Sequence, residues 1–253
     1  MEALAGLATL LFIAVGAGVG LRLVLLASKT RALPEALLGS GLFLIVGVGY
    51  GLLIAAGAVP NIARTLAALA VVVMALGWFC TWEFTRRVFR AGSPLAAGVT
   101  ALGMLALAVG ALSQVQLYLN ASSPIGELER SWAWQAIRVS ALACYLWSAA
   151  EALRYCAMLR RRTALGLADP VVANRFLLWA GVMIFSFLSL GGPAVSTWLG
   201  GAAYTDPGMQ LWIAANGFLC TVSLYLAFLP PAAYRRWLEQ GQPAPASAVA
   251  SAG

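Results

Sequence analysis

The chain contains no histidine, and Lys29 is its only lysine. Because imidazole is the commonest metal ligand and the usual axial ligand of b-type haem, the composition predicts no histidine-ligated metal or haem. A retinal protein needs a lysine in its last membrane helix for the Schiff base, and residues 209–230 contain none. We therefore expect no cofactor.

Groups suited to enzyme chemistry are also scarce. General acid–base catalysis requires a titratable side chain whose pKa is tuned near neutral pH. The apolar stretches contain no aspartate and no serine paired with a base, and no Gly-rich phosphate loop follows a strand. The four cysteines lack CxxC spacing and are typical of packing residues. The sequence therefore predicts neither a catalytic nor a metal site, and hence no enzyme.

Charge is rare, and apolar residues dominate. Only 10% of the 253 residues are charged and 62% are hydrophobic, whereas soluble domains have about 25% and 45–50%. A helix needs about 20 apolar residues to span a bilayer. The chain has seven such stretches, at about 3–27, 37–58, 65–85, 95–118, 132–153, 176–199 and 209–230. The sequence predicts an all-α seven-transmembrane-helix bundle over residues 1–236, then a disordered tail over 237–253 that is rich in Ala, Pro, Gly and Ser.

The cations cluster on one side of the predicted membrane, which explains the net charge of +7 without a nucleic-acid partner. Lys/Arg excess in short connections marks the cytoplasmic face, so we expect the amino terminus outside and the carboxyl terminus in the cytoplasm. Arginine outnumbers lysine fifteen to one, which suggests a GC-rich bacterium and thus a bacterial inner membrane. The thirteen clustered cations are Arg22, Lys29, Arg31, Arg86, Arg87, Arg90, Arg154, Arg160, Arg161, Arg162, Arg175, Arg235 and Arg236.

Arg138 is the strongest candidate for a binding residue. It follows the start of the fifth stretch by six residues, which places it on the order of 9 Å inside the helix. A charge at that depth ordinarily faces the bundle interior and marks a function, although an arginine can also extend to the headgroups. We predict a small anionic or polar ligand at Arg138. The other polar candidates for this pocket are Gln135, Gln114, Asn216 and Tyr145.

Two acidic residues at the predicted cytoplasmic helix ends repeat one spacing. Glu83 precedes Arg86, and Glu151 precedes Arg154, by three residues each. That spacing favours a local ion pair on one helix face. An alternative is a switchable lock in which each acid pairs with the other helix's arginine.

Glycine and proline mark two further features. Residues 191–193 read Gly191-Gly192-Pro193 inside the sixth stretch, where proline predicts a kink and the glycines allow a hinge. Small residues four apart, at Gly16 and Gly20 and at Gly47 and Gly51, favour close packing of the first two helices, with a homodimer as the alternative.

Two short stretches resemble uncharacterised bacterial seven-helix membrane proteins. They are residues 30–39, TRALPEALLG, and residues 169–179, DPVVANRFLLW. The resemblance implies no assigned activity. The topology is similar to that of microbial rhodopsins, but the retinal lysine and the helix-three aspartates are missing. Asp169 and Pro170 are predicted to cap and begin the sixth helix.

These features favour an inner-membrane ligand-binding or sensor protein whose polar pocket around Arg138 opens outward. With no cytoplasmic effector domain, its signal would pass to a membrane partner through the basic connections. A small-solute carrier using the same pocket is the first alternative. A structural subunit of a membrane complex is the second.

Overall fold

The computed structural model describes residues 2–123, 125–128, 130–200 and 206–240. These residues form helices and no strands, and seven helical spans are long and apolar enough to cross a membrane, which confirms the predicted fold class. The spans are α1 (Glu2–Thr30), α2–η1–α3 (Leu33–Ala58), α4 (Ala63–Phe89), α5 (Pro94–Asn120), α7 (Trp132–Ala164), α8 (Pro170–Trp198) and α9 (Pro207–Phe228).

Several helices extend beyond the predicted apolar stretches. The stretch expected at 132–153 becomes α7 and continues to Ala164, and the stretch expected at 176–199 begins at Pro170 as α8. Arg, Leu and Ala are good helix formers, so the helices continue after the apolar run ends. At 1.5 Å per residue, α7 is about 50 Å long, against about 30 Å for the hydrocarbon core. Asp169 accepts a hydrogen bond from the Val171 backbone N–H at 2.8 Å, as the predicted cap requires.

The second span is not a uniform α-helix. The segment η1 (Phe43–Gly49) is a π-helix between α2 (Leu33–Leu42) and α3 (Tyr50–Ala58). Gly77 of α4 faces this segment, and a Cβ at Gly77 would lie only 3.0 Å from the Gly41 carbonyl oxygen. The wider π turn therefore occurs where two helices approach at glycines, and π-bulges of this kind are frequent at functional sites.

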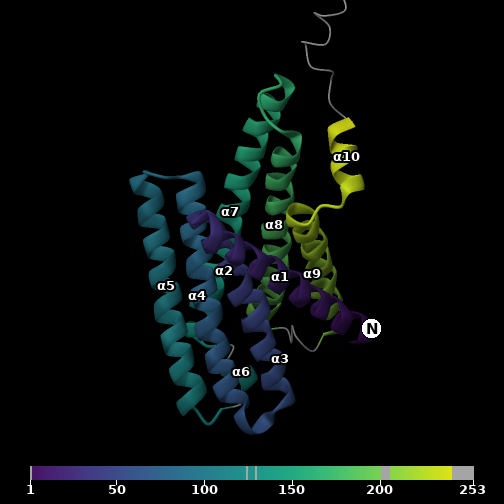
Figure 1. Ribbon diagram of the computed structural model, residues 1–253. Coiled ribbons are helices and arrows are strands. Elements are labelled where there is room, and N and C mark those ends of the chain that lie inside the picture. The colour runs from purple at the N-terminus through teal and green to yellow at the C-terminus, as the bar shows by residue number, and fades with distance from the viewer. Residues whose placement is uncertain (1, 124, 129, 201–205, 241–253) are drawn as a thin grey trace, which may run out of the picture.

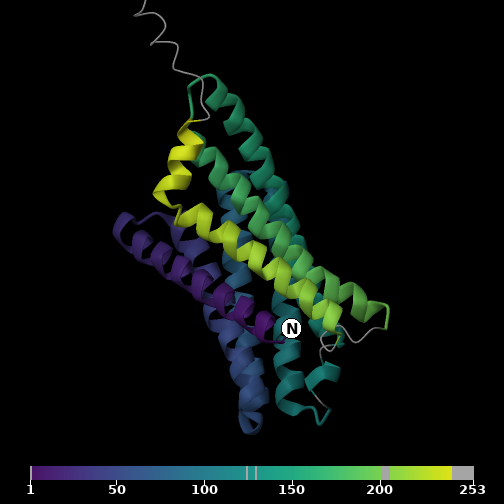
Figure 2. The ribbon, with the colours of Figure 1, turned by 90° about the vertical axis from the view of Figure 1, so that its right-hand side faces the viewer.

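The spans form a closed ring in chain order. Each packs on its neighbours, α9 packs back on α1, and α4 also contacts α7, so α5 lies outside their junction. Figure 1 shows α1 running obliquely across the bundle, and Figure 2 shows α1 and α9 sloping in the same direction.

The predicted close packing of the first two spans is present within the chain. A Cβ at Gly20 would lie 2.7 Å from the Phe43 nitrogen, and one at Gly47 would lie 3.0 Å from the Ala17 Cβ. Gly51 has nothing within 4 Å of its Cβ position. The spans are therefore in close contact at Gly20 and Gly47, and Gly51 takes no part in that contact.

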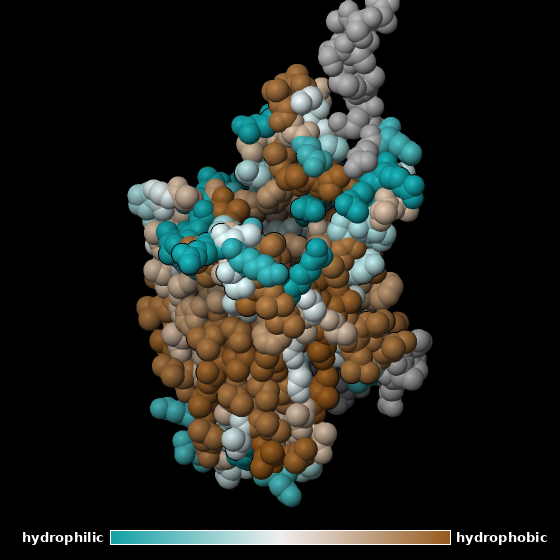
Figure 3. All heavy atoms as spheres, in the orientation of Figure 1, coloured by the Kyte–Doolittle hydropathy of each residue, from teal (hydrophilic) through white to brown (hydrophobic). Residues whose placement is uncertain are grey.

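The two ends of the bundle differ in charge. The connections α1–α2, α4–α5 and α7–α8 and the helix α10 (Ala232–Gln240) lie at one end, here called the arginine-rich end. A band of hydrophobic side chains separates polar side chains at the two ends (Figure 3), as a bilayer requires. The expected tail began at residue 237, but α10 continues to Gln240 because Arg236, Trp237 and Leu238 extend its helical run. Residues 241–253 lie outside the described part of the chain.

Candidate ligand-binding chamber

The centre of the bundle holds a chamber of about 610 Å³. Sites for drug-sized ligands measure about 300–1,000 Å³ and are mostly apolar with a few placed polar groups. All seven spans contribute to the wall. Along α8, the lining residues run from Trp179 to Thr197, which is about 27 Å of helix. The chamber therefore extends through much of the membrane-spanning part of the bundle.

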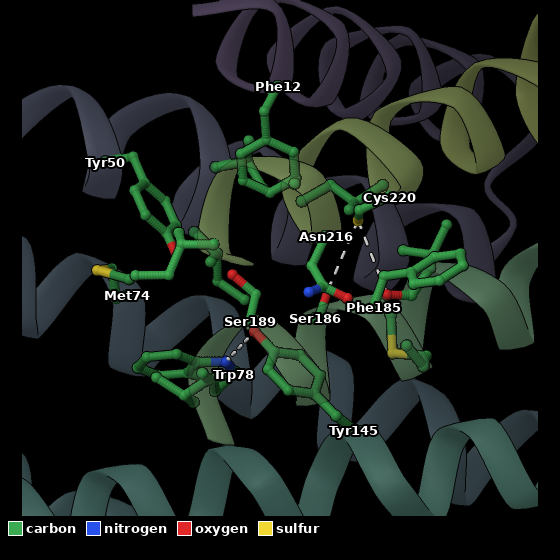
Figure 4. Close-up of a pocket in the computed structure, with 18 of the residues that line it drawn as sticks. Phe12, Tyr50, Met74, Trp78, Tyr145, Phe185, Ser186, Ser189, Asn216 and Cys220 are labelled. Atoms are coloured by element: carbon green, nitrogen blue, oxygen red, sulfur yellow. Dashed lines mark hydrogen bonds between the residues drawn. The ribbon is translucent and has the colours of Figure 1, made fainter. Parts of the chain in front are cut away.

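Hydrogen bonds fix the polar side chains in the middle of the chamber. The Trp78 indole N–H donates to the Tyr145 hydroxyl at 2.8 Å, which joins α4 to α7 (Figure 4). Ser186 of α8 contacts the Cys220 sulfur of α9 at 3.6 Å. The Asn216 amide donates to the Trp212 carbonyl oxygen at 2.8 Å, one turn earlier on α9. Because the Tyr145 hydroxyl oxygen accepts the bond from Trp78, its own proton points away from that indole.

Arg138 lies in the wall toward the end opposite the arginine-rich end. Its side chain is buried with 2% exposure, and its Cζ lies 5.9 Å from the centre of the Trp134 ring, within cation–π range. The ring of Trp134 precedes Arg138 by one helical turn and orients the guanidinium. Arg138 therefore faces the bundle interior and not the lipid headgroups.

Three of the five predicted pocket residues meet at the chamber, and two do not. Arg138, Tyr145 and Asn216 line it. Gln114 donates to the Leu128 carbonyl oxygen at 3.2 Å and accepts from the Ser131 hydroxyl at 2.7 Å, which holds the start of α7. Gln135 accepts from the Trp198 indole at 2.9 Å, which joins α7 to the end of α8. Both glutamines stabilise helix ends.

The predicted hinge lies beside the chamber within a continuous helix. α8 runs through Gly191, Gly192 and Pro193 without a break, and Pro193 is buried. The Trp212 indole of α9 donates to the Leu188 carbonyl oxygen at 2.9 Å. A Cβ at Gly192 would lie 2.6 Å from the Trp212 Nε1, so this glycine makes room for the indole. Of the predicted hinge residues, Gly192 therefore forms a docking site for Trp212.

The two acid–arginine pairs at the arginine-rich end behave differently. Glu83 binds Arg86 at 2.6 Å and also binds Arg87, both on α4. Glu151 of α7 binds Arg154 at 3.2 Å and Arg90, the residue after α4, at 2.9 Å. Among the described residues, the interhelical pair is therefore Arg90–Glu151, and the proposed exchange of Arg86 and Arg154 between the acids is not present.

Sequence reasoning missed several aromatic side chains of the wall. Phe12, Tyr50 and Trp179 line the chamber although they lie in strongly apolar stretches. The Phe12 and Tyr50 rings meet edge to face with centroids 5.7 Å apart. A stripe of aromatics at helical spacing is equally typical of a packed core, so the sequence alone offers no signal that separates the two.

Comparisons with known proteins return nothing for this chain: no family model, no curated protein and no solved structure matches it. The resemblance drawn from residues 30–39 and 169–179 therefore stays a prediction.

Proposed function

We propose that this membrane protein is a ligand-binding sensor of a bacterial inner membrane, with Arg138 anchoring an anionic group of the ligand in the central chamber. The observation that carries the proposal is a buried arginine in the wall of a 610 Å³ chamber that is otherwise mostly apolar. A guanidinium presents a rigid planar fork that matches a carboxylate, sulfonate or phosphate. The end of the chamber at Arg138 is proposed to face the outside.

The position of Arg138 favours a ligand site over a purely structural charge. Burying a cation is costly, and inside membranes such residues ordinarily serve a functional path or pocket. Trp134 and Arg130 also line the wall, so the chamber holds a second cation besides Arg138 and an aromatic face in contact with its guanidinium. The remaining wall supplies hydrophobic contact for the body of the ligand.

A pair of fluorescent probes tests the proposal. Anilinonaphthalene sulfonate carries an anion on an aromatic frame, and phenylnaphthylamine has the same frame without the anion. We expect both to bind the purified protein in detergent. Charge-assisted hydrogen bonds contribute about 1.5–3 kcal/mol, so Arg138→Leu should weaken the sulfonate about tenfold to a hundredfold. Arg138→Lys should weaken it less, and both variants should bind phenylnaphthylamine normally.

The controls separate the chamber from the detergent micelle. Ser189→Trp fills the chamber and should reduce binding of both probes, while Leu10→Trp adds the same ring on an exposed position of α1 and should change neither. Equal sulfonate binding by the protein and by Arg138→Leu would refute the anchor. Transport of the bound sulfonate into proteoliposomes would identify a carrier instead of a sensor.

A further inference from the structure

The shape of the chamber restricts the ligand. The chamber of about 610 Å³ extends along about 27 Å of α8, so it is elongated along the helices. Its volume lies in the range for one drug-sized ligand, so it suits one extended hydrocarbon chain. The two ends also differ: the end at the arginine-rich side is lined by Leu42, Met183 and Leu224, all buried and apolar, whereas Arg138 lies toward the other end.

The α1 and α3 parts of the wall pack on different neighbours. α1 packs on α2, η1 and α9, while α3 packs on α4, and no described residue of α3 is buried. α1 is in tight contact with the second span at Gly20 and Gly47, whereas α1 and α3 run in different directions in Figure 1. Ala8 and Phe12 of α1 and Tyr50 and Leu53 of α3 line the chamber. The helices therefore splay beside the chamber.

The edge-to-face pair of Phe12 and Tyr50 lies across this splay. In Figure 4 both rings stand on the same side of the chamber, above Trp78 and Tyr145. Two aromatic rings in edge contact stabilise each other by only about 0.5–1.5 kcal/mol, so their separation is a low-cost motion. The α8 side of the chamber has no such junction, because α8 packs extensively on both α7 and α9.

We infer that the ligand is a single-chain anionic amphiphile that enters from the bilayer between α1 and α3, past Phe12 and Tyr50. Its head group binds at Arg138 and its chain extends toward Met183 and Leu224. This inference rests on the proposed function and adds the route and the chemical class. Carboxylate and phosphate head groups share the required chemistry, because each offers anionic oxygens to a guanidinium.

A photoactivatable palmitate with a diazirine at the end of its chain tests both parts in proteoliposomes. We expect labelling of peptides that contain Met183, Leu224 or Leu42, reduced in Arg138→Leu. The corresponding fatty alcohol should label the protein and Arg138→Leu equally. A lysophosphatidate with the same diazirine tests the phosphate head: preferential labelling by it identifies a phosphate ligand, and preferential labelling by palmitate a carboxylate ligand. Labelling confined to lipid-facing residues such as Leu25 would refute the assigned site.

Matched tryptophan substitutions on α1 test the route. Ala8→Trp places a large ring in the splay, whereas Ala14→Trp places it on an exposed position of the same helix. Ala8→Trp and Leu53→Trp should slow palmitate labelling several-fold, and Ala14→Trp should not. Anilinonaphthalene sulfonate added from water to Ala8→Trp reports whether the chamber is intact.

The outcomes distinguish the two proposals. If the sulfonate binds in an Arg138-dependent way but palmitate labels no chamber peptide, the amphiphile and its route are refuted and the anchor stands. If Ala8→Trp and Ala14→Trp label at the rate of the unsubstituted protein, the route between α1 and α3 is wrong. If binding of the sulfonate does not depend on Arg138, the proposed function is refuted.

Discussion

Glu151 of α7 forms an ion pair with Arg90 at the end of α4, while Glu83 pairs only with arginines of its own helix. The Glu151 Oε1 accepts from Arg90 and Arg154 and also from the Trp147 indole at 3.3 Å. Its side chain is 7% exposed, against 20% for Glu83. Because Glu151 is buried and shared by several donors, it contributes to the packing of α4 on α7 as well as to local helix stability.

Glutamine substitutions should separate these two roles. Glu151→Gln removes the charge that three donors share, and hydrogen bonds to charged groups contribute about 1.5–3 kcal/mol, so its unfolding free energy should fall by about that amount. Glu83→Gln should cost about 0.4–1 kcal/mol, because it removes two local pairs, with Arg86 and Arg87, that contribute about 0.2–0.5 kcal/mol each. Thermal unfolding in detergent measures both. Equal losses would contradict the distinction drawn between the two acids.

At the scale of single residues, the sequence predicts how deep a residue lies in the membrane better than where its side chain points. The count from Trp132 to Arg138 correctly predicted a buried position, because helical rise is fixed. The sequence places Gln114 and Gln135 in the same pocket only because they are expected at the same depth in the membrane as Arg138. Their partners, Leu128, Ser131 and Trp198, lie at helix ends, whose positions relative to one another no helical periodicity predicts.

Among the elements, α8 contains two adjacent glycines, of which one accommodates a side chain of the neighbouring helix. A Cβ at Gly192 would collide with Trp212, whereas a Cβ at Gly191 would meet Leu142 at 3.6 Å and Phe187 at 4.0 Å, which are ordinary contacts. The two adjacent glycines therefore differ sharply in what surrounds them.

Alanine at these two positions forms a matched pair. Gly192→Ala should displace Trp212 from the Leu188 carbonyl and lower the unfolding free energy by about 1–3 kcal/mol, the cost of an overpacked contact. Gly191→Ala should be neutral or stabilising by up to about 1 kcal/mol, because alanine favours a helix over glycine. Thermal unfolding with tryptophan emission measures both effects. A Gly192→Ala variant as stable as Gly191→Ala would show that Trp212 is not seated at the glycine.

The existence and order of the spans could be predicted from hydrophobicity, but their internal form could not. Seven stretches of sufficient length require seven helices, because only a helix satisfies its own backbone in lipid. The π-helical turn at Phe43–Gly49 packs against Gly77, which is nearly thirty residues away in the chain. Likewise the chamber is lined from all seven spans, so its shape depends on how the helices pack in three dimensions.

At the scale of the whole molecule, the charge difference between the two ends predicts an orientation. Ser122 lies at the end opposite the arginine-rich end, and Thr163 lies at the arginine-rich end of α7. In intact cells, a cysteine at Ser122 should react with a membrane-impermeant maleimide, and a cysteine at Thr163 should react only after lysis. The unsubstituted protein is the control, because three native cysteines are buried and Cys80 is half-buried. The reverse pattern would invert the topology.

The length of α7 has a mechanical consequence. Glu151 holds α7 at the level where α4 ends, and thirteen further residues carry the helix to Ala164, about 20 Å beyond that point. A rigid rod pivoting there is a lever arm: a tilt of about 6° at Glu151 moves the tip by about 2 Å. Arg138 lies thirteen residues on the other side of Glu151, so a lean of α7 at the chamber is carried at about equal amplitude to its arginine-bearing tip, where a neighbouring molecule could register it as a displacement.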